Sequence, residues 1–144
     1  MLNIVFENNT GHKVDIDFLD TIAKSVSNKE IEFILTNNDE IHEINLTTRG
    51  IDKPTDVLSF PYDEMPNTPL GSIVISEDFV SNKSQELKHS FDDELALLFI
   101  HGLLHLIGYD HEIDNGEHRE KEEEMITQFN LPHSLIVRTH KEHN

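Results

Sequence analysis

Three histidines, His101, His105 and His111, are the side chains of this sequence best suited to chemistry. A helix turns by about 100° per residue, so side chains four positions apart lie on the same face, one turn apart. His101 and His105 would therefore point toward one site, and Gly108 would let the helix end in a left-handed conformation that turns the chain back with His111. Three neutral imidazoles leave one tetrahedral position of a zinc ion open, which is typical of a catalytic zinc. The spacing predicts one zinc ion bound by these three side chains.

The same spacing is found in the metzincin peptidases, whose pattern is H-E-x-x-H-x-x-G-x-x-H. All three histidines and Gly108 match, but this chain has Gly102 where the peptidases have a glutamate that acts as general base. A glycine side chain can neither accept nor donate a proton. The pattern therefore keeps the metal ligands and lacks the peptidase base. A zinc peptidase is kept only as an alternative function.

Composition and charge limit the kind of protein. The chain has 144 residues, enough for one domain with a real core, and it has no cysteine, so a zinc ion must be bound by histidine or carboxylate. Its formal net charge of −17 is strongly acidic for a protein that must approach a polyanion. No stretch resembles a signal peptide or a membrane span, so we expect a cytoplasmic protein that does not bind membranes.

Many acidic residues follow the third histidine, and only Arg119 and Lys121 are fixed cations among them. We interpret this run as a solvated helix face near the metal, with a second metal site as the alternative. Within it, Asp110 and Glu112 flank His111 and could orient an imidazole, or could be ordinary loop acids in solvent. The acids of the run are Asp110, Glu112, Asp114, Glu117, Glu120, Glu122, Glu123 and Glu124.

The other histidines have no ligand spacing among themselves, and we expect them to be ordinary exposed side chains. His118 is the one nearest to the predicted site in sequence. The set comprises His12, His42, His89, His118, His133, His140 and His143.

The elements that must position the site follow from the hydrophobic pattern. Strands are predicted at Leu2–Glu7, Glu30–Thr36, Asp56–Tyr62 and Leu70–Ser76. Helices are predicted from an Asp15 or Asp17 cap through Val26, from an Asn38 or Asp39 cap to Arg49, from Glu77 to Leu87 after a Ser76 cap, from about Asp92 to Ile107 after a Ser90 cap, and from Asp114 to Phe129. The helix that carries the site would pack against the sheet through Leu95, Leu98, Phe99, Gly102 and Leu106. The first strand, helix and second strand suggest a parallel unit, and the last two strands should be neighbours.

The segment HGLLHLIGYDH at positions 101–111, together with Arg49-Gly50 and TDVLSFP at positions 55–61, resembles the YbeY family of bacterial endoribonucleases. The resemblance implies one α/β (α+β-like) domain over residues 1–144, with a small mixed four-stranded sheet packed by helices and one zinc held by the three histidines. It also implies a single-strand-specific, metal-dependent endoribonuclease that acts in ribosomal RNA maturation and ribosome quality control. In this family an arginine at the corresponding position is functionally important, and the resemblance implies that role for Arg49.

One residue departs from the family pattern. Members usually have Leu-Gly-Asp where this chain has Leu70, Gly71 and Ser72, so any role of that acid is in doubt here. Lys53 is a weaker candidate than Arg49 for binding the RNA backbone, and Tyr109 could either donate its hydroxyl to the site or pack against the sheet.

Two routes of RNA cleavage remain open from the sequence. A bound zinc lowers the pKa of water to near 7 and so supplies hydroxide, or it polarises a phosphoryl oxygen while the ribose hydroxyl attacks. In the second route the planar Arg49 guanidinium would neutralise charge on the phosphorane.

The acidity of the chain predicts weak binding to naked RNA. Productive binding would then need a ribosomal or ribosome-associated protein that offers basic surface; no DNA partner is expected. Besides the endoribonuclease and the zinc peptidase, a third possible function is a ribosome assembly factor without enzyme activity, in which zinc is structural.

Overall fold

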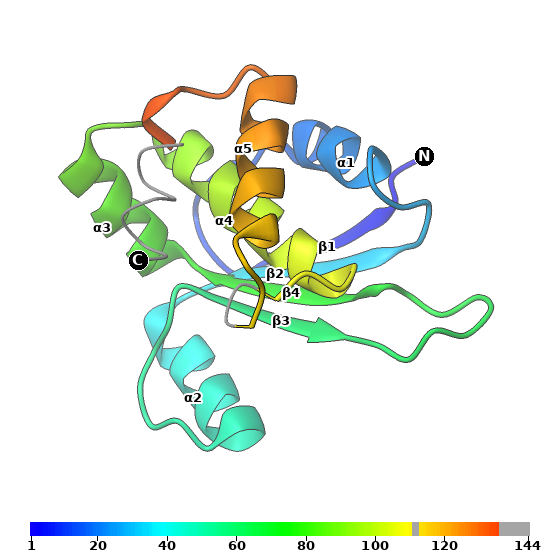
Figure 1. The fold of residues 1–144 in the computed structure, drawn as a ribbon. Coiled ribbons are helices and arrows are strands. Elements are labelled where there is room, and N and C mark those ends of the chain that lie inside the picture. Colours follow the sequence, from blue (N-terminus) through cyan, green and yellow to red (C-terminus); the bar gives the residue numbers. More distant parts are fainter. Residues whose placement is uncertain (111–112, 136–144) are drawn as a thin grey trace.

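Four strands form one mixed sheet in the order β1-β2-β4-β3 in the computed structural model, which describes residues 1–110 and 113–135 (Figure 1). β2 pairs in parallel with β1 and with β4, whereas β3 runs antiparallel to β4 at the edge. The predicted α/β fold with a mixed four-stranded sheet is confirmed, as are the parallel first unit and the neighbouring last strands. The bounds are β1 Ile4–Asn8, β2 Ile31–Thr36, β3 Val57–Pro61 and β4 Gly71–Ser76.

Side chains alternate between the two faces of the sheet, as the period of a strand requires. On β2, Ile31, Phe33 and Leu35 are fully buried in the main core, whereas Ile34 packs in a smaller cluster with Val74 of β4. Residues of odd number on β2 and β4 therefore face the main core, and residues of even number face the other side.

Five helices cover the sheet unequally. Their bounds are α1 Ile16–Lys24, α2 Asn38–Arg49, α3 Glu77–Leu87, α4 Phe91–Leu106 and α5 Glu117–Gln128. Figure 1 shows α1, α3 and α4 on one face of the sheet, with α5 against α4, and α2 alone on the other face. The smaller cluster, which includes Ile41 of α2, lies on that second face.

Two helix caps differ from the prediction, one in its position and one in its hydrogen bond. The side chain of Asn37, rather than Asn38 or Asp39, caps α2 by accepting a hydrogen bond from the Glu40 backbone N–H at 2.9 Å. Ser76 precedes α3 as predicted but makes no side-chain cap, because its hydroxyl donates to Asn38 Oδ1 at 2.7 Å. At α3, a contact between elements thus replaces the local cap that the sequence suggests.

Helix α4 lies directly on the sheet because Gly102 faces it. A Cβ at this position would be 2.9 Å from Ser59 Oγ of β3 and 3.1 Å from Ile73 Cγ2 of β4. The Asp93 backbone N–H donates to the predicted cap, Ser90, at 3.0 Å. The predicted sheet-facing side chains of the helix, Leu95, Leu98, Phe99 and Leu106, are all buried.

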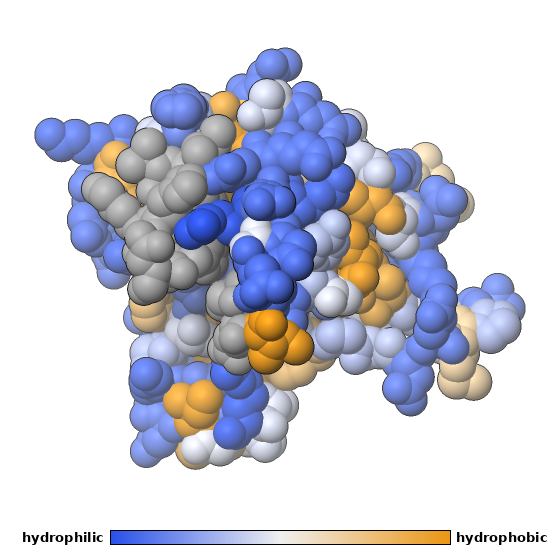
Figure 2. All heavy atoms as spheres, viewed as in Figure 1, coloured by the Kyte–Doolittle hydropathy of each residue, from blue (hydrophilic) through white to orange (hydrophobic). Residues whose placement is uncertain are grey.

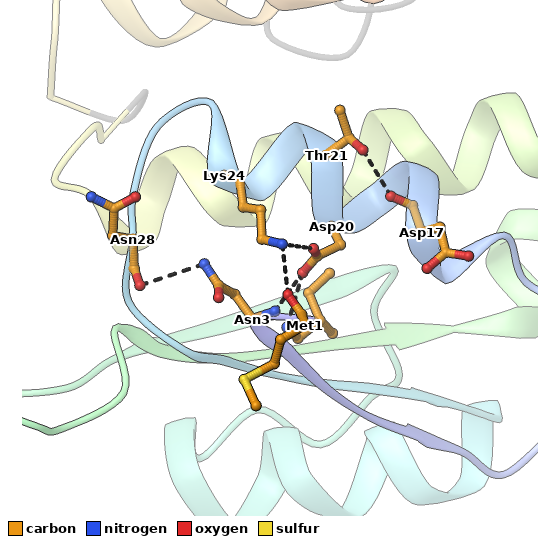
Figure 3. Close-up of polar contacts among 8 residues, drawn as sticks. Met1, Asn3, Asp17, Asp20, Thr21, Lys24 and Asn28 are labelled. Atoms are coloured by element: carbon orange, nitrogen blue, oxygen red, sulfur yellow. Dashed lines mark hydrogen bonds and ion pairs between the residues drawn. The ribbon is translucent and has the colours of Figure 1, made fainter.

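A buried carboxylate joins α1 to the start of β1 (Figure 3). Asp20 accepts hydrogen bonds from the backbone N–H groups of Asn3 at 2.7 Å and Ile4 at 3.1 Å, and pairs with the Lys24 ammonium at 2.9 Å. Burial opposes ionisation of this carboxyl, but the hydrogen bonds and the Lys24 charge outweigh it and lower the pKa of Asp20.

The face drawn in Figure 2 is largely hydrophilic, and its apolar patches are separated from one another. Among the described residues, no helix is both long and apolar enough to cross a membrane.

Candidate metal centre

Helix α4 carries two histidines on a face that does not contact the sheet. The rings of His101 and His105 lie with their centroids 4.9 Å apart and their planes at 75°. The helix ends at Leu106, and Gly108 has a φ of 109°, the left-handed conformation predicted for this position. The i, i+4 spacing thus brings two imidazoles to one place, as a metal site requires.

The predicted third ligand, His111, and the neighbouring Glu112 lie outside the described residues. Asp110, the other acid predicted to flank the ligand, is half-buried. The structure therefore leaves His111 as a prediction from the sequence.

His118 of α5 is a third imidazole at this place, and the expectation that it is an exposed histidine is wrong. Its side chain is fully buried, stacked on the His101 ring at 4.5 Å and 21°, and set edge-on to the His105 ring at 4.7 Å and 86°. The Tyr109 ring lies 6.0 Å away at 49°. The same expectation is wrong for His89, whose side chain is buried and 2.7 Å from the carboxylate of Glu94.

The start of α5 is held in place by Asp114, a member of the acidic run. One of its carboxylate oxygens accepts from the Gly116 backbone N–H at 2.8 Å, and the other from the His118 backbone N–H at 2.9 Å. A carboxylate at a helix N-terminus satisfies backbone donors and favours the helix dipole. Asp114 thereby fixes the start of α5, and with it the position of His118 in the site.

Glu122 contradicts the interpretation of the acidic run as a purely solvated face. Its carboxylate is buried and accepts a hydrogen bond from Nδ1 of His101, and the same oxygen lies 3.2 Å from Nε2 of His118. Glu120 and Glu124, on the same helix, are exposed as expected. The signal in the sequence was a glutamate four positions after a histidine on a predicted helix, which puts the two on one face.

Within residues 1–110 and 113–135, His101, His105 and His118 form a group that could hold a metal ion, since one ligand atom of each lies within 4.8 Å of the others. A set of imidazoles with a carboxylate bound to the second nitrogen of one ring suits zinc and related transition metals. A metal cofactor therefore fits the side chains present.

Arg49 is the last residue of α2, on the face of the sheet opposite to α4. It is exposed and forms no ion pair with any described residue, and Gly50 ends the helix in the left-handed conformation. Lys53 is exposed a few residues further on. The structure thus leaves both cations available to a ligand but does not bring either into the histidine cluster.

Ser72, the departure from the family pattern, is buried on β4. Its even position puts it on the α2 face of the sheet, beside Glu32 of β2 and opposite Phe60 of β3. A carboxylate here would lie across the sheet from the histidine cluster.

The fold and the site define a class: a mixed α/β domain with a candidate metal centre between α4 and α5. The family model described as endoribonuclease YbeY matches residues 6–130, and the chain belongs to this family. Among curated relatives, the endoribonuclease YbeY of Sulfurimonas denitrificans is 60% identical over 136 residues, covering 94% of this chain and 98% of the relative. That of Aliarcobacter butzleri is 61% identical over 137 residues, with the same two coverages.

A solved structure has the same fold. The solution structure of a Thermotoga maritima protein matches with a TM-score of 0.63 and 33% identity, covering 90% of this chain and 89% of that one. The match supports the sheet order and helix placement described above.

Proposed function

We propose that this protein is a zinc-dependent endoribonuclease, specific for single-stranded RNA, that acts in ribosomal RNA maturation and ribosome quality control. The cluster of His101, His105 and His118, in a chain of the YbeY family, supports this function. The relatives named above are endoribonucleases by name, which supports RNA as the substrate. The compartment we propose is the cytoplasm.

His101, His105 and His111 are the proposed ligands of one zinc ion. Two of the three lie on α4 with their rings 4.9 Å apart, and Gly108 makes the turn that precedes the third. His118 is the alternative third ligand, because it is buried against both rings. Metal analysis of the His111→Ala and His118→Ala variants shows which histidine is the third ligand. We expect the His111→Ala variant to lose tight zinc binding.

When bound, zinc would supply a Lewis acid, either to lower the pKa of a bound water or to polarise a phosphoryl oxygen while the ribose hydroxyl attacks. His101 and His105, one turn apart on α4, would hold the metal from this helix, and the buried His118 ring packs against both imidazoles from α5. Arg49 is proposed to bind the substrate phosphate, since its guanidinium is planar, permanently charged and available. Because β3 is the edge strand, an RNA strand that crosses this edge would contact both sides of the sheet.

The peptidase alternative loses support from the position of Gly102. A side chain here would meet Ser59 and Ile73 rather than solvent, so this position cannot offer a general base.

The proposal is tested by incubating zinc-loaded protein with ribosomal RNA and, separately, with casein. A His105→Ala variant, which loses a metal ligand, is the matched control for contaminating nuclease. We expect RNA cleavage by the parent protein, none by the variant, and no cleavage of casein. Casein cleavage would favour the peptidase, and equal RNA cleavage by both proteins would contradict the proposal.

A protein that needs zinc for folding and cleaves neither substrate would instead fit the assembly factor with a structural zinc. A ribosomal or ribosome-associated protein partner is proposed as well, because the chain itself carries a net charge of −17.

A further inference from the structure

A buried glutamate on α5 requires a physical reason. Removing a carboxylate from water is costly unless it is paired and hydrogen-bonded, and Glu122 is fully buried although its helix is otherwise rich in exposed acids. The side chain contacts two imidazoles of the candidate metal centre, His101 and His118. Its burial is therefore tied to that centre.

We propose that Glu122 is a positioning residue that sets the tautomer and orientation of His101 for metal binding. Nδ1 of His101 keeps its proton and donates a hydrogen bond to the Glu122 carboxylate, so Nε2 is the ring nitrogen with a lone pair for a metal. A carboxylate bound to the second nitrogen of an imidazole also raises its basicity and holds the ring in place. Glu122 would thus act on a bound metal through His101.

His118 supports this arrangement from the same helix. It lies one turn before Glu122 on α5, approaches the same carboxylate oxygen at 3.2 Å, and stacks on the His101 ring at 4.5 Å. The stacked ring limits rotation of His101 about its side-chain bonds, and the shared oxygen ties both imidazoles to α5. Docking of α5 on α4 is thereby coupled to the geometry of the metal ligand.

The acids predicted from the sequence to orient a ligand, Asp110 and Glu112, adjoin His111 in the chain. Glu122 acts instead on His101, a ligand carried by a different element. The inference rests on the proposed metal site but is independent of RNA cleavage.

The first test measures zinc affinity by competition with a chelator, in the full-length protein without RNA. Glu122→Ala should weaken binding by about 10- to 100-fold. Glu122→Gln keeps the volume and an acceptor oxygen but loses the charge, so its loss should be smaller. Glu120→Gln is the matched control, since Glu120 is exposed on the same helix and should bind zinc like the parent protein. Affinity of the Glu122→Ala protein equal to that of the control would overturn the proposal.

The second test reads the tautomer of His101 in the metal-free protein by ¹⁵N NMR, at a pH well above the usual imidazole pKa. The parent protein should carry the proton on Nδ1, whereas Glu122→Gln should weaken this preference and Glu122→Ala should shift it toward Nε2. A role limited to packing would leave the tautomer unchanged, and that result would overturn the proposal even if the affinity fell. If Glu122→Ala does not fold, the Glu122→Gln protein decides through both readouts.

The two proposals fail separately. Loss of zinc affinity and a changed tautomer in a protein that cleaves no RNA would leave Glu122 as the positioning residue and contradict the nuclease. A parent protein that binds no zinc would overturn both.

Discussion

Gly102 shows how one residue can carry two kinds of information. From the sequence it marks the missing base of the peptidase pattern, and in the structure it is the point where α4 touches the sheet. The absence of a side chain is thus favoured by packing as well as consistent with different chemistry. The spacing of the histidines and the sheet-facing side of the helix were readable in the sequence, but the close approach of Ser59 to position 102 depends on how the helix docks.

The contact at Gly102 predicts the stability of its variants. Gly102→Ala should lower the free energy of unfolding by about 1 kcal/mol, because overpacking costs about 1–3 kcal/mol and the gain in helix propensity returns about 1 kcal/mol. The loss should be smaller in a Ser59→Ala background, since the nearest atom to the new Cβ is Ser59 Oγ. Chemical denaturation of the parent protein, the two single variants and the double variant measures the coupling between positions 102 and 59. Additive changes in the free energy of unfolding would contradict the contact.

Arg49 gives a prediction that separates a catalytic role from a structural one. Arg49→Ala should leave zinc content unchanged and lower the rate of RNA cleavage by up to about 3 kcal/mol of transition-state stabilisation. Its position at the end of α2 would explain only a stability change of a few tenths of a kcal/mol through the helix dipole. Single-turnover cleavage at saturating RNA, compared with metal analysis of the same samples, makes the distinction; an unchanged rate removes Arg49 from the mechanism.

At the scale of elements, the order and type of every strand and helix described follow from the hydrophobic pattern. The fully buried Ile31, Phe33 and Leu35 alternate along β2 as their spacing requires. What the pattern did not show was which polar side chains become buried where two helices meet. Glu122 and His118 read as exposed because their burial depends on α5 docking against α4, a contact between segments that no local pattern encodes.

The link between α1 and β1 predicts how stability depends on pH. The pKa of Asp20 is lower in the folded protein, so the unfolded state binds more protons between the two pKa values. The stabilisation from Asp20 is therefore complete above the unfolded pKa of about 3.9 and is lost as the pH falls through the lower folded value.

Asp20→Asn should remove this dependence and cost about 1–2 kcal/mol at neutral pH, because hydrogen bonds to a charged acceptor are replaced by weaker ones. Asp17→Asn is the control, since Asp17 is exposed on the same helix (Figure 3). Denaturant unfolding measured across the acid range tests the prediction. Parallel pH profiles of the Asp20→Asn and parent proteins would contradict it.

At the scale of the whole molecule, charge sets how the protein meets RNA. A net charge of −17 repels a polyanion at long range, and Arg49 and Lys53 are the cations proposed to contact it. With about two phosphate contacts, the logarithm of the binding constant for single-stranded RNA should fall with the logarithm of salt concentration with a slope near −1.4, from about 0.7 per contact. Fluorescence anisotropy at several salt concentrations measures this slope. Tight binding to any RNA with a much steeper slope would contradict the need for a basic partner.

We propose that a metal held by the α4 histidines makes this protein a ribonuclease. The most direct measurement is the rate of cleavage of a single-stranded ribosomal RNA fragment as zinc is added back to chelator-stripped protein, beside a His105→Ala control treated in the same way. We expect a rate that rises with zinc and levels off at about one equivalent, the occupancy of a single catalytic site, with no rise in the control. Cleavage by the stripped protein at the full rate, or an equal rise in the control, would contradict it.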